Sequence, residues 1–174
     1  MKKFLLSALC ITAFTLTACD KKTDNTSAKT NDASSPTLVA PATLSQNNQV
    51  HMQSDLRLIQ TLTNNKAQDA LKFQTEVNEA AQRGEEPDLK LISVKLETYV
   101  NDFNKELDAL KLQSSEVDSL RTKLKESNQI GLDLTKAGTS APQDTAKIAE
   151  LQKKATDLQQ ELISETQAIE IKAN

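Results

Sequence analysis

Glycine and aromatic residues are scarce in this sequence of 174 residues, which contains three Gly, four Phe, one Tyr and no Trp. Three glycines cannot supply the many tight turns of a β-sandwich or barrel, nor the glycine-rich loops that hold nucleotide phosphates. Five aromatic side chains are also too few for surfaces on which bases or sugars stack. The composition therefore predicts a protein built from helices.

The residues that carry most metal and acid-base chemistry are nearly absent. His51 is the only histidine, and no second histidine or free cysteine can join it in a catalytic pair. No cluster of His, Cys and carboxylate residues has the spacing of a metal site. An enzyme hypothesis would need Ser114 or Ser115 as nucleophile with Lys111 or Lys123 as base, but no recognisable catalytic motif surrounds them. We expect no catalytic residue, no metal and no cofactor.

The amino terminus has the pattern of a secretory signal peptide. Lys2 and Lys3 precede an apolar run that extends from Phe4 to Leu16, and small residues follow it. The run is too short to span a bilayer, because a membrane-spanning helix needs about 20 apolar residues. Residues 1–18 are therefore predicted to be removed as a signal peptide, together with Cys10.

The four residues Leu16-Thr17-Ala18-Cys19 resemble the lipobox of bacterial lipoprotein precursors. The resemblance implies cleavage between Ala18 and Cys19, a diacylglycerol on the sulfur of Cys19, and a further acyl chain such as palmitate on its new amine. Each buried methylene contributes about 0.8 kcal/mol, so two or three chains attach a protein durably to a membrane. The alternative is ordinary cleavage near Ala18, which leaves a free thiol at Cys19.

The net charge of the protein also indicates that it is attached to the membrane through lipid and not through a basic surface. Loss of Lys2 and Lys3 with the signal peptide leaves 19 basic and 24 acidic residues, a net charge of −5. A mildly acidic domain is unsuited to nucleic acid and to an anionic bilayer surface. Asp20 resembles the inner-membrane retention signal of enterobacterial lipoproteins, but Lys21 beside it weakens the match. The choice between inner and outer membrane stays open, as does that between periplasm and cell surface.

The segment 19–46 has the composition of a disordered tether. Thr, Ser, Asn, Asp and Lys dominate it, and its only large apolar residues are Leu38, Val39 and Leu44. Such a segment cannot bury enough apolar surface to offset its ordering entropy. A flexible chain of this length reaches roughly 25–30 Å. A passive linker is the simpler interpretation, and a binding motif at Leu38-Val39 is the alternative.

Residues 47–174 have the periodicity of a helical domain. Apolar residues recur every three or four positions, which places them on one face of each helix. Gly84 and Gly138 suit helix ends, and the order Ser140 to Gln143 fits a capping box that opens the last helix. We expect three helices, at about 47–83, 88–137 and 141–172.

The length of the middle segment leaves two architectures open. At 1.5 Å per residue it would span roughly 75 Å, too long to be covered by one neighbour. If it is whole, the fold is an antiparallel three-helix bundle or pair of helical hairpins with coiled-coil-like packing. If it breaks near 113–115, where Ser115-Glu116-Val117-Asp118 fits a helix start, the fold is a four-helix bundle. No Gly or Pro lies at the break, so we predict three helices.

Two groups of residues on the apolar stripes are candidate binding sites. Ser114, Ser127 and Gly131 are small residues that would leave a groove for a partner helix, or allow close packing within the bundle. The second group would form a ligand pocket, although core packing is the default for aromatics on a stripe. It consists of Phe73, Tyr99 and Phe103.

We therefore predict a membrane-anchored cell-envelope lipoprotein whose helical domain serves protein interaction, with another protein or with itself, or acts as a spacer. The alternative is a periplasmic binding module, chaperone or adaptor that takes a hydrophobic ligand or a partner helix. No nucleic acid is expected as a partner.

Overall fold

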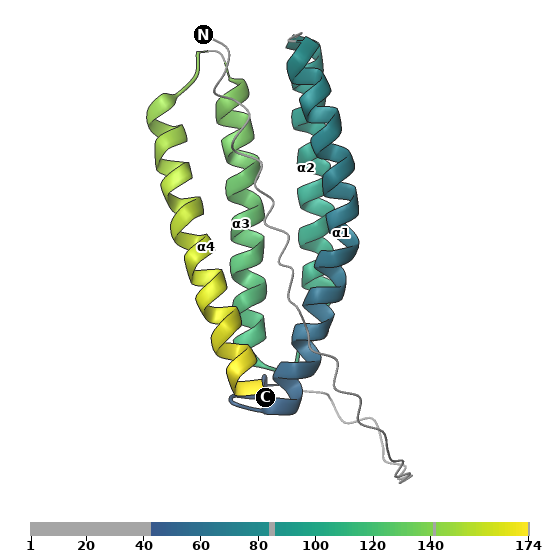
Figure 1. The fold of residues 1–174 in the computed structure, drawn as a ribbon, viewed down its shortest axis with the longest axis vertical. Coiled ribbons are helices and arrows are strands. Elements are labelled where there is room, and N and C mark those ends of the chain that lie inside the picture. The colour runs from purple at the N-terminus through teal and green to yellow at the C-terminus, as the bar shows by residue number, and fades with distance from the viewer. Residues whose placement is uncertain (1–42, 84–85, 141, 174) are drawn as a thin grey trace.

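A computed structural model describes residues 43–83, 86–140 and 142–173. These residues form four helices that run up and down beside one another (Figure 1). Their bounds are α1 Gln49–Arg83, α2 Glu86–Ala109, α3 Ser115–Thr139 and α4 Thr145–Ala173. The all-α class is confirmed.

The expected continuous helix over 88–137 is wrong, and the alternative with a break near 113–115 is the arrangement found. Helix α2 ends at Ala109 and α3 begins at Ser115. The break is stabilised from α1, where Oδ2 of Asp55 accepts hydrogen bonds from the backbone N–H of Gln113 (2.8 Å) and of Ser114 (2.7 Å). The same oxygen accepts a bond from Oγ of Ser114 at 2.9 Å. A carboxylate from another helix thus satisfies backbone donors ahead of α3.

The connection between α3 and α4 differs from the expected capping box. Ser140 ends α3 instead of opening α4, because its backbone N–H donates to the carbonyl of Lys136 at 3.1 Å. Asp144 caps α4, with Oδ1 accepting from the backbone N–H of Lys147 at 2.9 Å. Gln143 donates from Nε2 to the carbonyl of Gly138 at 2.6 Å, so it contributes to the end of α3.

The helices pack in chain order, and the bundle is tightest at one end. Contacts are extensive between α3 and α4, between α2 and α3 and between α1 and α2, whereas α1 touches α4 and α3 less. Figure 1 shows α1 beside α2 and α4 beside α3, with the two pairs coming together at the end where the carboxyl terminus lies. We call this end the base.

Two clusters of buried apolar side chains hold the helices together. The larger one contains residues of all four helices, among them Leu107 and Val117, which are completely buried. The smaller one joins α1, α2 and α3 and consists of Phe73, Ile92, Leu96, Val100 and Leu132. Ile130 and Leu134 belong to the first cluster and Leu132 to the second, so α3 contributes to both.

The chain that leads into α1 is paired with the turn between α2 and α3. The backbone N–H of Ser45 donates to the carbonyl of Gln113 at 2.7 Å, and the N–H of Ser115 donates to the carbonyl of Ser45 at 2.9 Å. Asn47 then adopts a left-handed conformation with φ of 53°, which reverses the chain before α1. The last residues of the expected tether, 43–46, are therefore part of the described structure. Its residues 19–42 and the signal peptide 1–18 lie outside the described residues.

Candidate functional site

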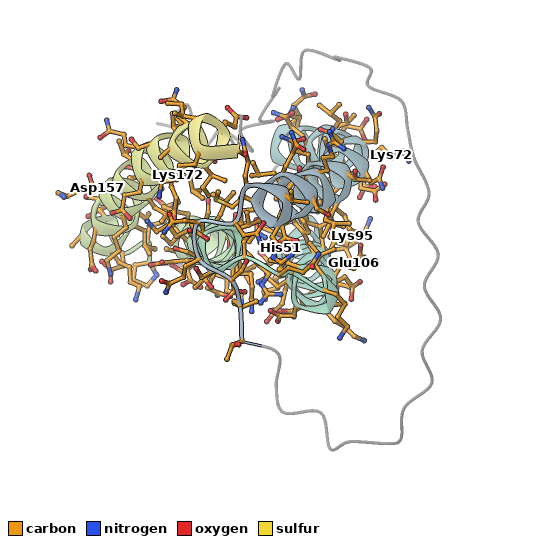
Figure 2. The ribbon with its side chains drawn as sticks, turned by 90° about the horizontal axis from the view of Figure 1, so that it is seen from below. His51, Lys72, Lys95, Glu106, Asp157 and Lys172 are labelled. Atoms are coloured by element: carbon orange, nitrogen blue, oxygen red, sulfur yellow. The ribbon has the colours of Figure 1, made fainter. Side chains whose placement is uncertain are left out.

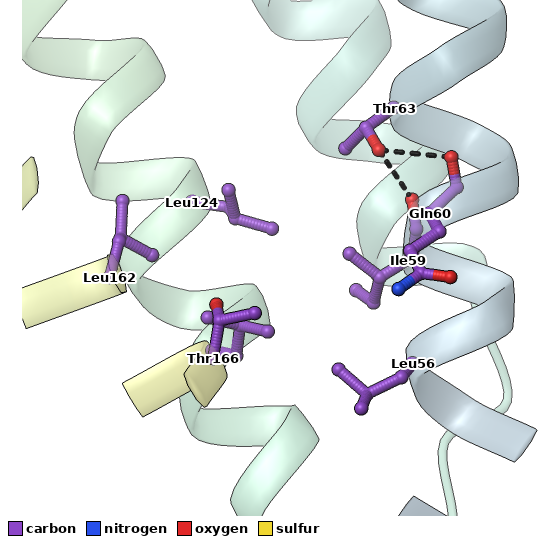
Figure 3. Close-up of a pocket in the computed structure, with 8 residues that line it drawn as sticks. Leu56, Ile59, Gln60, Thr63, Leu124, Leu162 and Thr166 are labelled. Carbon is purple, nitrogen blue, oxygen red and sulfur yellow. Dashed lines mark hydrogen bonds between the residues drawn. The ribbon is translucent and has the colours of Figure 1, made fainter. Parts of the chain in front are cut away.

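A cleft lies between α1, α3 and α4. It is shallow, with a cavity volume of about 30 Å³, and it is partly open to solvent. Five of its eight lining side chains are Leu or Ile, so it offers apolar contact (Figure 3). The hydroxyl of Thr63 donates to the carbonyls of Ile59 (2.9 Å) and Gln60 (3.0 Å), which occupies that group within α1. The lining residues are Leu56, Ile59, Gln60, Thr63, Leu120, Leu124, Leu162 and Thr166.

The small residues of α3 have two different environments. Ser114 is completely buried, and its hydroxyl is bonded to Asp55 at the base. Ser127 is exposed, and a methyl group added at Gly131 would meet no atom within 4 Å. Ser127 and Gly131 follow the cleft residue Leu124 at steps of three and four, so they continue the same face of α3. The structure thus brings two of the three candidate groove residues to the cleft side of α3.

The three candidate pocket aromatics are stacked on one another between α1 and α2. The rings of Phe73 and Tyr99 are 6.5 Å apart and nearly parallel, and those of Tyr99 and Phe103 are 6.2 Å apart and tilted. The Tyr99 hydroxyl donates to the carbonyl of Lys66 at 3.1 Å. Burial, followed by the charges of Asp69 and Glu106, raises the pKa of Tyr99 to about 12. None of the three aromatic side chains lines the cleft between α1, α3 and α4.

His51 contacts Ser45, which also contacts the turn between α2 and α3. Oγ of Ser45 lies 2.8 Å from Nδ1 of His51 and 3.0 Å from the carbonyl oxygen of Gln113. When the hydroxyl donates its single proton to that carbonyl, the bond to His51 needs the tautomer with the proton on Nδ1. The pair therefore fastens the chain ahead of α1 to the turn at the base.

Glu116 completes this fastening from the first turn of α3. Its Oε1 accepts a hydrogen bond from the backbone N–H of Asn47 at 2.7 Å, and Nζ of Lys172 lies 3.4 Å from Oδ1 of Asn47. The bond from Asn47 is the main reason why the pKa of Glu116 lies below its ordinary value. The residues from Ser45 to Asn47 are thus held by α3 as well as by the turn.

The lowered pKa of Glu116 predicts a pH dependence. A carboxyl group with a depressed folded-state pKa stabilises the fold fully above its unfolded value of about 4.5, and the contribution is lost as the pH falls through the folded value. We expect Glu116→Gln to reduce stability slightly at pH 7 and to flatten the loss of stability below pH ~4.5. Urea unfolding at several pH values tests this. Glu126→Gln, at an exposed position on α3, is the control, and equal pH profiles for the two variants would contradict the prediction.

Asp55 and Ser45 are the residues of this region that sequence reasoning missed. Asp55 is completely buried, and its Oδ1 has no hydrogen-bond partner in the described structure. The sequence does contain a sign of this buried carboxylate. Asp55 lies three positions after Met52 and four before Ile59, which places a charged residue on the apolar face of α1. Ser45 carried no such signal, since serine is common throughout the expected tether.

The described ranges contain neither a metal-binding cluster nor a membrane-spanning helix. Within 43–83, 86–140 and 142–173, no three His, Cys, Asp or Glu side chains are grouped so that they could hold a metal ion. In the same part of the chain, no helix has both the length and the apolar character needed to cross a membrane. The predicted lipidation residue Cys19 and cleavage-site residue Ala18 lie outside this part of the chain.

Comparison with known proteins gives one match. The sequence model of a family described as "Uncharacterised lipoprotein PM1805" matches residues 53–174. The matched region begins in the first turns of α1 and contains the turn at the base and every residue that lines the cleft. No curated protein and no solved structure matches the chain.

Proposed function

This chain belongs to the family described as "Uncharacterised lipoprotein PM1805", and we propose that it is a cell-envelope lipoprotein whose helical domain is a protein-interaction module. The observation that carries this proposal is the apolar cleft between α1, α3 and α4. Membrane attachment is assigned to Cys19, through a diacylglycerol on its sulfur and an acyl chain on its amine.

The form of the cleft favours a protein as its occupant. Its cavity volume of about 30 Å³ is far below the roughly 300–1,000 Å³ of pockets that enclose drug-sized ligands, and the cleft is partly open to solvent. An open apolar cleft between helices suits side chains presented by another helix at steps of three and four. Ser127 and Gly131 extend this face with small side chains, which let a helix approach closely.

We assign the domain no catalytic role. The hydroxyl of Ser45 bridges the His51 ring and the backbone carbonyl of Gln113, and the hydroxyl of Ser114 donates to the buried carboxylate of Asp55. Both hydroxyl groups are therefore occupied in holding the base of the bundle together.

Photocrosslinking in intact cells tests the interaction proposal. A photoreactive phenylalanine analogue at Gln60, on the edge of the cleft, is expected to give covalent adducts that are larger than this chain. The control carries the same analogue at Val94, which is 61% exposed on α2, a helix that contributes nothing to the cleft. Absence of adducts from Gln60, or equal adducts from both positions, would show that the cleft is not an interaction site.

A further inference from the structure

The base of the bundle carries the two most exposed large apolar side chains in the described part of the chain. Ile171 is 78% exposed two residues before α4 ends, and Val50 is 73% exposed as the second residue of α1. These helix ends meet, because Nζ of Lys172 lies 3.4 Å from Oδ1 of Asn47. Figure 2 views the bundle from below, where α1 begins near His51 and α4 ends near Lys172. Two aliphatic side chains are therefore exposed to water at the same end of the bundle.

The chain that enters the base is free of charged residues. No Asp, Glu, Lys or Arg occurs from Thr43 to Ser54, although 26% of the sequence is charged. This uncharged run ends at Asp55, which is completely buried, and Arg57 beyond it is exposed. Leu44 within the run is 38% exposed. The run therefore presents a surface of uncharged polar and aliphatic side chains.

The charged residues at the edge of the base differ in exposure according to their sign. Lys111, in the turn between α2 and α3, and Lys172 are exposed. Glu116 and Glu170 are half-buried. Glu116 is also bonded to the backbone N–H of Asn47 at 2.7 Å. The ammonium groups are thus more accessible than the carboxylates, although the chain as a whole is acidic.

Apolar side chains exposed on α2 have different surroundings. Leu91 and Val94 lie in the half of α2 that is farther from the base, because this helix begins at Glu86 and reaches the base at its end. They are flanked in sequence by Lys90 and Lys95. Isolated apolar side chains among charges are ordinary on a protein surface. They therefore serve as controls for those at the base.

The expected position of the lipid anchor indicates what the base faces. Ser45, which is bonded to the turn at the base, lies 26 positions after Cys19. A flexible chain of this length reaches roughly 25–30 Å. Helices of 24 to 35 residues are about 36–52 Å long, so the opposite end of the bundle lies beyond that reach when the base is near the anchor. A lipid on Cys19 therefore keeps the base, of all parts of the bundle, next to the bilayer.

We propose that the base of the bundle rests on the bilayer that holds the lipid anchor. Val50 and Ile171 enter the boundary between headgroups and acyl chains, where their surface is removed from water. Lys111 and Lys172 extend to the lipid phosphates, as long basic side chains do at a membrane surface. The inference rests on the proposed function, because the lipid on Cys19 brings the base to the membrane. Such a contact directs the helices away from the bilayer and leaves the cleft open to a partner.

Fluorescence quenching by lipid tests this contact. The lipidated full-length protein is placed in phosphatidylcholine vesicles that contain a lipid with a doxyl quencher at carbon 5 of an acyl chain. Bimane is attached to Val50→Cys or Ile171→Cys, where the new thiol is the only free one if Cys10 is removed and Cys19 is lipidated. We expect quenching at least about threefold greater than from bimane at Val94→Cys, because side chains at the base reach the depth of the quencher. Equal quenching from all three positions would overturn the proposal.

A charge variant provides the second arm. Val50→Asp places a carboxylate in the contact with lipid, and we expect it to reduce the quenching of bimane at Ile171→Cys by about threefold or more. The control is Val94→Asp, which makes the same change at a valine that is 61% exposed on α2. Both valines are exposed, so both variants should unfold at similar urea concentrations. Quenching that neither variant changes would overturn the contact at Val50.

Flotation of the vesicles separates this inference from the proposed function. Protein that floats with the vesicles but shows no quenching from the base would leave the lipid anchor standing and overturn the contact of the base. Bimane emission at shorter wavelength without quenching by lipid would show that protein, such as a second copy, covers the base, and would also overturn it. Lipidated protein that does not float with the vesicles would overturn both the anchor and the contact.

Discussion

Replacing Cys19 by serine is expected to transfer the protein from the membrane fraction to the soluble fraction of cells. In the proposed function, the diacylglycerol is bonded to the sulfur of Cys19, and the acyl chains on this residue would supply the membrane affinity, at about 0.8 kcal/mol for each buried methylene. Without residues 1–18 the chain has 19 basic and 24 acidic residues, and such a net negative charge does not favour an anionic bilayer surface. Cell fractionation and incorporation of labelled palmitate measure the effect.

Cys10→Ser is the matched control for this experiment. It changes the only other cysteine, which lies in the apolar run of the signal peptide and is expected to be removed with it. We expect Cys10→Ser to fractionate with membranes and to incorporate palmitate as the unchanged protein does. Persistent membrane association of Cys19→Ser would contradict lipid anchoring at this residue.

Asp55→Ala is expected to have the largest effect on stability, a loss of about 3 kcal/mol or more. The carboxylate accepts three hydrogen bonds, from the backbone N–H groups of Gln113 and Ser114 and from the hydroxyl of Ser114. Removal of one partner from a buried hydrogen bond leaves the other unsatisfied, at a cost of about 1–3 kcal/mol for each group. Urea unfolding of the soluble Cys19→Ser protein measures the free energy.

Two further variants separate the possible causes of this loss. Asp102→Ala removes an exposed carboxylate from α2 and is expected to change stability by less than ~0.5 kcal/mol. Asp55→Asn keeps one acceptor oxygen but loses the negative charge, so it should fall between the other two. If Asp55→Ala were as stable as Asp102→Ala, the carboxylate would not be what holds the turn at the base.

The sequence predicted the end of the first helix better than it predicted whether the middle helix is continuous. The end of α1 at Arg83 follows from Gly84, and the all-α class follows from the periodic apolar residues. The break between Ala109 and Ser115 was predicted only as the alternative architecture, because it is stabilised by Asp55, which lies in another helix. A carboxylate that acts across the fold leaves no glycine or proline signal at the site that it stabilises.

The cleft could not be predicted from the sequence either, because it depends on contacts between different helices. Periodicity identified the buried faces that include Leu56, Ile59, Leu120 and Leu162, but it does not fix how far apart two helices lie. The aromatics predicted to form a pocket stack on one another between α1 and α2, whereas Leu and Ile residues line the cleft. The sequence pattern therefore predicted which residues are apolar and buried, whereas the position of the cleft depends on how α1, α3 and α4 pack against one another.

The pairing of Ser45 with the turn between α2 and α3 has a mechanical consequence. Tension on a lipid anchor travels along the chain and meets the fold first at Ser45, before it reaches α1. The two backbone hydrogen bonds that Ser45 makes with Gln113 and Ser115 transfer part of this load to α2 and α3. These helices come much later in the chain than the pulled segment. A pull from the membrane is therefore shared across the base, and the first turn of α1 is protected from unwinding by forces that act on the anchor.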